Sequence, residues 1–334
     1  MVEGLSREAR LALFERMLLM RRFEEMVIHM AAKHKYIGRN HLYIGHEATG
    51  AAALMQLEPG DLSYTTHRNH GHFIARGADP GKALAEIMGR VGGLNAGRGG
   101  TWHLCDTSIG FHSTSAMVGG SIGLSIGGGY ALKHQGKGRV SVALFGDGTL
   151  DEGISYESLN FASVFELPVL FLCENNSKAG QRPSSMLAAK ALGNVPSALN
   201  IACEIVDGAD AEAVHATLKG ALARIRKEGK PVFVEATLER WPGSHQLKPE
   251  FTTGITDITQ AWDDSKITGQ YADWIRKFDP IRRYARVLLD NKTVTKDDLL
   301  AIDKRVTQQT EAARDFAEAS PFPKPESAVA GAFA

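Results

Sequence analysis

The stretch VSVALFGDGTLDEGISYESLNFASVFELPVLFLCENN, residues 140–176, decides the fold of this 334-residue chain. It opens with VSVALF, an apolar and β-rich run that is typical of a buried parallel strand. A helix is predicted over about 153–165, and a second buried strand over 169–173. The strand–helix–strand pattern predicts two parallel strands whose carboxyl ends meet at one edge of a sheet, which is where open α/β sheets bind ligands.

Polar residues follow both of these strands. Gly146-Asp147-Gly148 comes after the first strand, and Glu174-Asn175-Asn176 ends the second. The glycines allow the backbone to turn tightly. An Asp carboxylate, an Asn carbonyl and one backbone carbonyl are hard oxygen ligands, so they could hold Mg²⁺ while a bound diphosphate completes its octahedron.

Gly-Asp-Gly and Asn-Asn at this spacing resemble the signature of thiamine diphosphate enzymes. Over roughly residues 10–320 the chain is similar to the alpha subunit of the decarboxylating dehydrogenase component of 2-oxo-acid dehydrogenase complexes, a group that includes pyruvate, branched-chain and acetoin dehydrogenases. The segments that carry this resemblance are RFEE (22–25), NHLYIGHEA (40–48), TTHRNHG (65–71), ARG (75–77), RGGTWH (98–103), VGGSIG (118–123) and DPI (279–281).

Helices and buried strands alternate from about 45 to 240, with later strands at 203–206 and 232–238 and an amphipathic helix between them. This alternation predicts an α/β fold with a three-layer parallel sheet and helices on both faces, as in the thiamine diphosphate-binding fold. We expect an N-terminal helical arm at 1–40, the cofactor-binding α/β domain at 41–270, and C-terminal helices with an irregular tail at 271–334. Ser6 is expected to cap the first helix.

The resemblance implies a metal site. Asp147 and Asn176 match the family's Mg²⁺ ligands, and the third ligand would be the backbone carbonyl of Lys178. The family often has Tyr at that last position, where only the backbone is used.

The resemblance also implies a binding site for thiamine diphosphate. Arg68, His67 and His70 lie in a Thr-rich segment that resembles the diphosphate-binding one, although the family usually has Tyr where this chain has His67. Gly146 and Gly148 belong to the motif, and Val118 matches the residue that wedges under the cofactor and bends it. From residue type alone, Arg68 could form a surface ion pair, and Val118 could be an ordinary core residue.

The catalytic loop departs from the family pattern, which is Arg, two variable residues and then Gly-His-Ser. Here the run is Arg240-Trp241-Pro242-Gly243-Ser244-His245, so that Ser244 takes the His position unless the loop shifts by one residue. We expect His245 to contact the cofactor and to supply the imidazole, which can move protons near neutral pH. His41 matches a second His near the reacting carbon. The segment 241–266 is expected to order over the cofactor.

For the activity, the resemblance implies that the cofactor ylid attacks a substrate carbonyl. Decarboxylation or C–C cleavage follows, and then acyl transfer to lipoyl-lysine on an acyltransferase. The Glu that activates the cofactor comes from a beta subunit in this family, so we expect a heterotetramer with cofactors at alpha–beta interfaces. The small residues at 119–129 would let one helix pack closely against another subunit.

Three alternatives remain open from the sequence. The first is a split transketolase-like or acyl-transferring thiamine diphosphate enzyme without a lipoyl partner. The second is a non-enzymatic or regulatory homologue, which the altered loop at Ser244 and His245 keeps open. The third is a nicotinamide-binding dehydrogenase, because residues 123–129 loosely match a dinucleotide fingerprint.

Composition excludes several other classes. The formal net charge is zero, with 43% hydrophobic and 23% charged residues, and no basic stripe indicates nucleic-acid binding. No apolar run approaches the length of a membrane span, and the N-terminus carries acidic residues instead of a signal-type apolar core. The three cysteines are far apart, which favours a reducing cytoplasm over a disulfide framework.

Overall fold

Six parallel strands form one sheet in the part of the chain that the computed structural model describes, which is residues 4–33, 35, 38–176, 191–244 and 256–329. Their order across the sheet is β2-β1-β3-β4-β6-β5, and all neighbours are parallel. The strands are β1 (Leu62–Thr66), β2 (Phe111–Ser115), β3 (Ser141–Gly146), β4 (Val169–Asn175), β5 (Ala202–Asp207) and β6 (Val232–Thr237).

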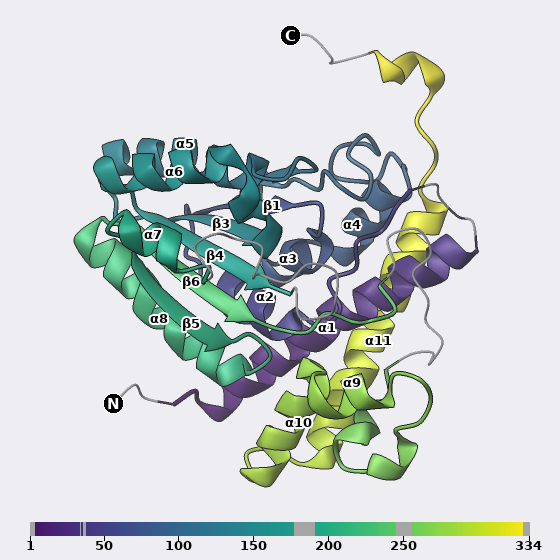
Figure 1. Ribbon diagram of the computed structural model, residues 1–334. Helices are drawn as coiled ribbons and strands as arrows, with labels where there is room; N and C mark the ends of the chain where they lie inside the picture. Colours follow the sequence, from purple (N-terminus) through teal and green to yellow (C-terminus); the bar gives the residue numbers. More distant parts are fainter. Residues whose placement is uncertain (1–3, 34, 36–37, 177–190, 245–255, 330–334) are drawn as a thin grey trace.

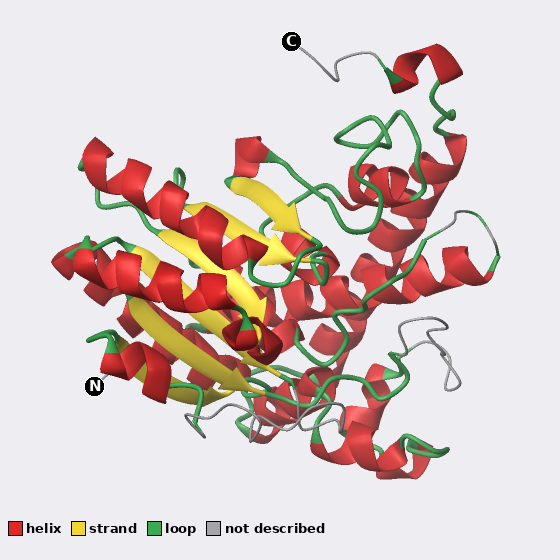
Figure 2. Ribbon diagram, turned by 45° about the horizontal axis from the view of Figure 1, so that its top comes forward, coloured by secondary structure: helices red, strands yellow, loops and turns green. Residues whose placement is uncertain are grey.

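Helices cover both faces of the sheet, so that it forms the middle of three layers (Figures 1 and 2). In Figure 1, α5 and α6 lie above the sheet, and α8, α2 and α1 lie below it. The α-helices of the described residues are α1 (Arg7–Ala32), α2 (Glu47–Leu54), α3 (His70–Ala75), α4 (Pro80–Ile87), α5 (Gly120–Gln135), α6 (Gly153–Val164), α7 (Asn194–Ala198), α8 (Ala211–Glu228), α9 (Ala272–Lys277), α10 (Pro280–Asp290) and α11 (Lys296–Ala319).

The central strands β3, β4 and β6 are mostly apolar because both of their faces are buried. Along β3, Val142 and Leu144 belong to the core between the sheet and helices α2 and α8. Ala143 and Phe145 belong to the core between the sheet and helices α5 and α6. Successive side chains of a strand point to opposite faces, so one continuous apolar run fills two cores. The predicted three-layer α/β fold is confirmed.

The individual elements also match the prediction closely. The strands predicted from 140, 169, 203 and 232 appear as β3, β4, β5 and β6, and the helix predicted from 153 appears as α6. Sequence analysis did not single out β1 and β2. These strands read LSYTT and FHSTS, so their hydroxyl-rich sequences lack a continuous apolar run.

The N-terminal helix α1 is part of the core. The hydroxyl of Ser6 accepts a hydrogen bond from the backbone N–H of Ala9 at 3.2 Å, which confirms the predicted cap. Phe14 and Met17 on this helix are fully buried. Helix α11 packs against α1 and α4 (Figure 1).

Within the described residues, each helix is too short or too polar to cross a membrane.

Candidate active site

The two polar motifs lie side by side at the carboxyl edge of the sheet. Strands β3 and β4 are hydrogen-bonded neighbours, and Gly146 is in register with Glu174. Asp147 begins a short 3₁₀ helix, η2 (Asp147–Asp151), directly after β3. A Cβ atom added to Gly148 would meet no other atom within 4 Å, so this turn faces open space. The motifs that the sequence placed at two strand ends therefore form one site.

A cavity of about 200 Å³ opens at this edge of the sheet. Its lining comes from loops after β1, β3, β4 and β6, and from the segment before α5. The lining residues are Thr66, His67, Arg68, Met117, Val118, Gly146, Gly148, Thr149, Glu174, Asn176 and Arg240. Five of the predicted cofactor-binding positions, at 67, 68, 118, 146 and 148, lie here together with the predicted metal ligand at 176.

Two guanidinium groups face this cavity. Burial lowers the pKa of Arg68 to about 10, and the neighbouring positive charge of Arg240 acts in the same direction. Burial also lowers the pKa of Arg240, which the negative charge of Asp147 opposes. The Arg68 guanidinium donates a hydrogen bond to the backbone carbonyl of Leu42. The two positive charges repel each other at a partly buried surface. An anion with several oxygen atoms would relieve this repulsion and could accept hydrogen bonds from both guanidinium groups.

A separate contact holds each residue at the end of β4. Glu174 accepts a hydrogen bond from the hydroxyl of Tyr43, and His72 Nε2 lies 3.3 Å from the same carboxylate. Burial raises the pKa of the Glu174 carboxyl, but His72 and the other neighbours more than offset this and hold it below its usual range. The Asn175 amide donates to Glu235 at 2.7 Å. These contacts fix the backbone from which the side chain of Asn176 extends.

The segment that precedes α2 lies against Asn176. The Asn176 side-chain amide nitrogen is 2.8 Å from His46 Nε2, and His46 Nδ1 is 3.2 Å from the backbone carbonyl of Tyr43. Burial lowers the pKa of His46 to about 3. The imidazole is therefore neutral near pH 7.

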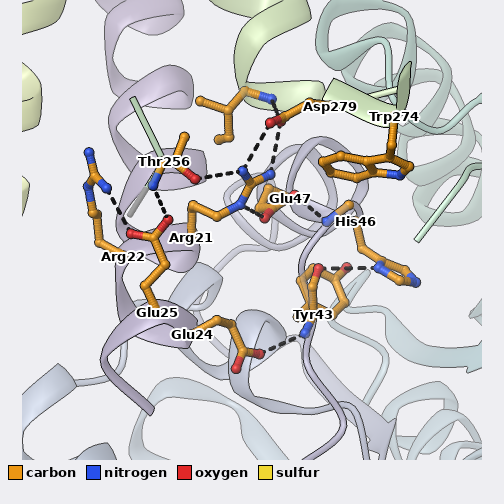
Figure 3. A network of polar contacts seen from close by, with 12 residues as sticks. Arg21, Arg22, Glu24, Glu25, Tyr43, His46, Glu47, Thr256, Trp274 and Asp279 are labelled. Atoms are coloured by element: carbon orange, nitrogen blue, oxygen red, sulfur yellow. Dashed lines mark hydrogen bonds and ion pairs between the residues drawn. The ribbon is translucent and has the colours of Figure 1, made fainter. Parts of the chain in front are cut away.

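Buried ion pairs support this segment from the other side (Figure 3). The Glu47 carboxylate accepts from the backbone N–H of Gly45 at 2.9 Å and from the Arg21 guanidinium at 2.6 Å. Arg21 also donates to Asp279 at 2.9 and 3.1 Å and to the Thr256 hydroxyl at 3.1 Å. Helices α1, α2 and α10 thus meet at one buried cation.

His41 lies beside the cavity, with its ring centre 4.3 Å from that of His67 and 5.8 Å from that of Trp102. Burial and the charges of His67 and Arg68 lower the pKa of His41 to about 3. Its Nδ1 atom is buried and has no hydrogen-bond partner among the described residues. His41 is not one of the residues that line the described cavity, and a buried polar atom without a partner is rare in folded proteins.

The apolar rim of the cavity is exposed. Val118 is 47% exposed and Met117 is 76% exposed, although both side chains are large and hydrophobic. Val118 is therefore no ordinary core valine in this chain. Arg68 lines the cavity, which disfavours the alternative of a surface ion pair.

Two predicted site residues, Lys178 and His245, lie outside the described residues. Ser244 is buried, and its backbone N–H closes a turn on the carbonyl of Trp241 at 3.1 Å. Ser244 does not line the described part of the cavity. The choice between Ser244 and His245 stays a prediction.

Sequence reasoning assigned no role to His46, Glu174 or Tyr43. His46 and Asn176 are 130 positions apart, and Tyr43 and Glu174 are 131 apart. No spacing rule connects such positions. The only available signal was the presence of Tyr43 and His46 in the segment NHLYIGHEA, which already carried the resemblance.

Comparison with known proteins shows which family this chain belongs to. Residues 15–326 match the family described as dehydrogenase E1 component. The chain is 33% identical to the alpha subunit of acetoin:2,6-dichlorophenolindophenol oxidoreductase from Bacillus subtilis, over 96% of this chain and 93% of that protein. It is 31% identical to the pyruvate dehydrogenase E1 component subunit alpha of Rickettsia typhi, over 93% and 91% of the two chains. The corresponding Rhizobium meliloti subunit is 32% identical, over 95% and 88%. This chain belongs to the dehydrogenase E1 component family.

Proposed function

We propose that this chain is the alpha subunit of a thiamine diphosphate-dependent dehydrogenase that acts on a 2-oxo acid or on acetoin. The observation that carries the proposal is the meeting of Asn176, Arg68 and Arg240 around one cavity at the carboxyl edge of the sheet. Asp147 is not part of the described lining, but it follows Gly146 of the lining directly and its negative charge acts on Arg240. Relatives with the names of acetoin and pyruvate dehydrogenase alpha subunits support this choice over a nicotinamide-dependent enzyme.

The residues around the cavity fit the family's cofactor. A diphosphate would bring the negative charge that the pair Arg68 and Arg240 lacks, and the open space beside Gly148 leaves room for its oxygen atoms. Asp147 and Asn176 offer one carboxylate and one amide oxygen to Mg²⁺, together with the backbone carbonyl of Lys178. We infer that the exposed side chain of Val118 contacts the ring portion of the cofactor.

Thiamine diphosphate supplies the nucleophilic carbon for attack on a substrate carbonyl. The chain's own residues would bind the cofactor and its metal ion. Arg68 and Arg240 would bind the diphosphate, while Asp147 and Asn176 would hold the metal. We infer that the unpartnered Nδ1 of His41, beside the cavity, forms a hydrogen bond with a bound group, since its lowered pKa makes the ring a poor proton acceptor near pH 7. His245 is our candidate for the second imidazole.

A beta-type partner would complete the site. The described cavity of about 200 Å³ is smaller than ligand pockets usually are, at about 300–1,000 Å³. Beside it, helix α5 exposes Leu124, Gly127 and Tyr130, with the half-buried Gly123 on the same helical face. Small residues on an exposed apolar face favour close packing of a helix from another chain. A lipoyl acyltransferase would be the acyl acceptor.

The test is cofactor binding by an Asp147→Asn variant. Asp147 would be the charged metal ligand, so its loss should weaken Mg²⁺-dependent binding of thiamine diphosphate by at least the roughly 10–100-fold seen when outer partners of a metal site are lost. Isothermal calorimetry on the assembled protein measures this affinity. Asp151→Asn is the matched control because Asp151 is an exposed residue of the same 3₁₀ helix. Equal affinities for the two variants would refute the site.

A further inference from the structure

His46 occupies an unusual position for a histidine, since it is fully buried and both ring nitrogens face polar groups. Nδ1 lies 3.2 Å from the backbone carbonyl of Tyr43, and Nε2 lies 2.8 Å from the side-chain amide nitrogen of Asn176. The ring stacks at a tilt on Tyr43, with 4.9 Å between the ring centres. His46 does not itself line the described cavity, but Asn176 does.

These two contacts determine where the ring proton is. A carbonyl oxygen can only accept a hydrogen bond, so Nδ1 carries the ring proton and donates a hydrogen bond to the backbone carbonyl of Tyr43. The atom that faces Nε2 is the side-chain nitrogen of Asn176, and an amide NH₂ can only donate, so Nε2 accepts this hydrogen bond and carries no proton. The group that faces Nε2 must be a donor. Of the two ends of the Asn176 amide, only the NH₂ end satisfies this condition.

The contact therefore selects one of two orientations of the amide. Because the amide is planar, holding its nitrogen on His46 directs its oxygen away from His46. An amide nitrogen has no lone pair for a metal ion, whereas the amide oxygen is a good ligand for Mg²⁺. A flipped amide would present NH₂ to the cation and would face Nε2 with an oxygen that has no proton to give.

The backbone around His46 is fixed independently of Asn176. Gly45 has φ +98°, and a Cβ atom at this position would lie 2.8 Å from the backbone oxygen of Glu239, so only glycine fits without strain. The Glu47 carboxylate holds the backbone N–H of Gly45 and is itself held by Arg21 (Figure 3). His46 is thus presented by a rigid segment and can orient a more exposed side chain.

We propose that His46 is a positioning residue, which holds the Asn176 amide so that its oxygen faces the metal ion of the cofactor site. This inference rests on the proposed function, because it assumes that Asn176 is a metal ligand. His46 does not contact the cofactor or the substrate in this arrangement. It acts through Asn176 alone.

The experiment measures metal affinity directly and needs no turnover. Mn²⁺ is titrated into the assembled protein at saturating thiamine diphosphate, and free Mn²⁺ is measured by electron paramagnetic resonance. His46→Leu should weaken Mn²⁺ binding by about 10–100-fold, the usual effect of losing a partner that orients a metal ligand. His46→Gln should keep the affinity within about tenfold of the unmodified protein, because glutamine can offer an amide oxygen as acceptor in place of Nε2.

A second pair of variants isolates orientation from other effects of the substitution. A carboxylate has two equivalent oxygens, so Asn176→Asp removes the need for an oriented amide. In that background His46→Leu should weaken Mn²⁺ binding by less than about tenfold, and the double-mutant cycle reports the difference. His215→Leu, which removes a half-buried imidazole on α8, is the control for loss of a histidine as such. If His46→Leu does not fold by circular dichroism, His46→Met replaces it.

The outcomes separate the two proposals. If Asp147→Asn abolishes Mn²⁺ binding while His46→Leu leaves it unchanged, the metal site stands and the role of His46 is refuted. If His46→Leu weakens binding equally in the Asn176 and Asp backgrounds, His46 acts by another route and the inference also fails. If Asp147→Asn leaves Mn²⁺ binding intact, the proposed function itself is wrong.

Discussion

Arg21 is the buried cation that holds Glu47 and, through it, the segment before α2. Its replacement tests how much this buried ion pair contributes to the free energy of unfolding. Its side chain is 2% exposed and donates to Glu47, Asp279 and Thr256 (Figure 3). Arg21→Met preserves much of the volume but leaves two buried carboxylates without their cation. Loss of one partner from a buried pair costs about 3–5 kcal/mol, so we expect a loss of unfolding free energy in that range.

Arg305→Met is the matched control for this prediction. Arg305 makes an equally short two-pronged contact with Glu15, at 2.7 and 2.8 Å, but its side chain is 55% exposed. An exposed pair contributes about 0–1 kcal/mol, because water screens the charges and solvates each partner after the other is removed. The same substitution at two similar ion pairs should therefore differ several-fold in its effect. Urea unfolding followed by circular dichroism measures both.

The pH dependence provides a second signature. Burial raises the pKa of the Glu47 carboxyl, and Arg21 opposes this effect. Without Arg21 the pKa should rise further, so that the folded state prefers the protonated form. The deficit of Arg21→Met should then be smaller near about pH 5 than near about pH 8, and should grow as pH rises through the folded-state pKa. A loss no larger than that of Arg305→Met, or a deficit that shrinks as pH rises, would refute this account.

Two further predictions concern the partner interface and the catalytic imidazole. A Cβ atom on Gly127 of α5 would meet nothing within 4 Å in this chain, so Gly127→Leu should fold normally but fail to co-purify with the beta-type partner. Gly220 on α8 is equally unobstructed, and Gly220→Leu should still co-purify with that partner. His245→Ala should lower turnover of the assembled enzyme by roughly 10² or more while changing cofactor affinity less. If His245→Ala keeps near-normal turnover and His41→Ala or Ser244→Ala loses it, the one-residue loop shift is wrong.

The sequence alone predicted the strands that fill two cores and the motifs that follow them. The run from Val140 to Phe145 is apolar at every position except Ser141 because alternate side chains enter opposite cores, and that pattern is local. The turn at Gly146-Asp147-Gly148 and the position of Asn176 directly after β4 follow from the same local pattern. Because parallel neighbours end at one edge, their meeting could also be expected.

Only the tertiary structure decided which groups hold these motifs in place. Tyr43 reaches Glu174, and His46 reaches Asn176, across more than 125 positions of intervening chain. The choice between the two ends of a planar amide depends on one ring nitrogen, whose proton depends in turn on a backbone carbonyl. Such contacts follow from how the segment before α2 lies against the end of β4, and burial by the rest of the fold makes them strong. The spacing of residues in the sequence predicts the periodicity of a single helix or strand. It does not predict which side chain from a distant segment contacts that element, or from which direction.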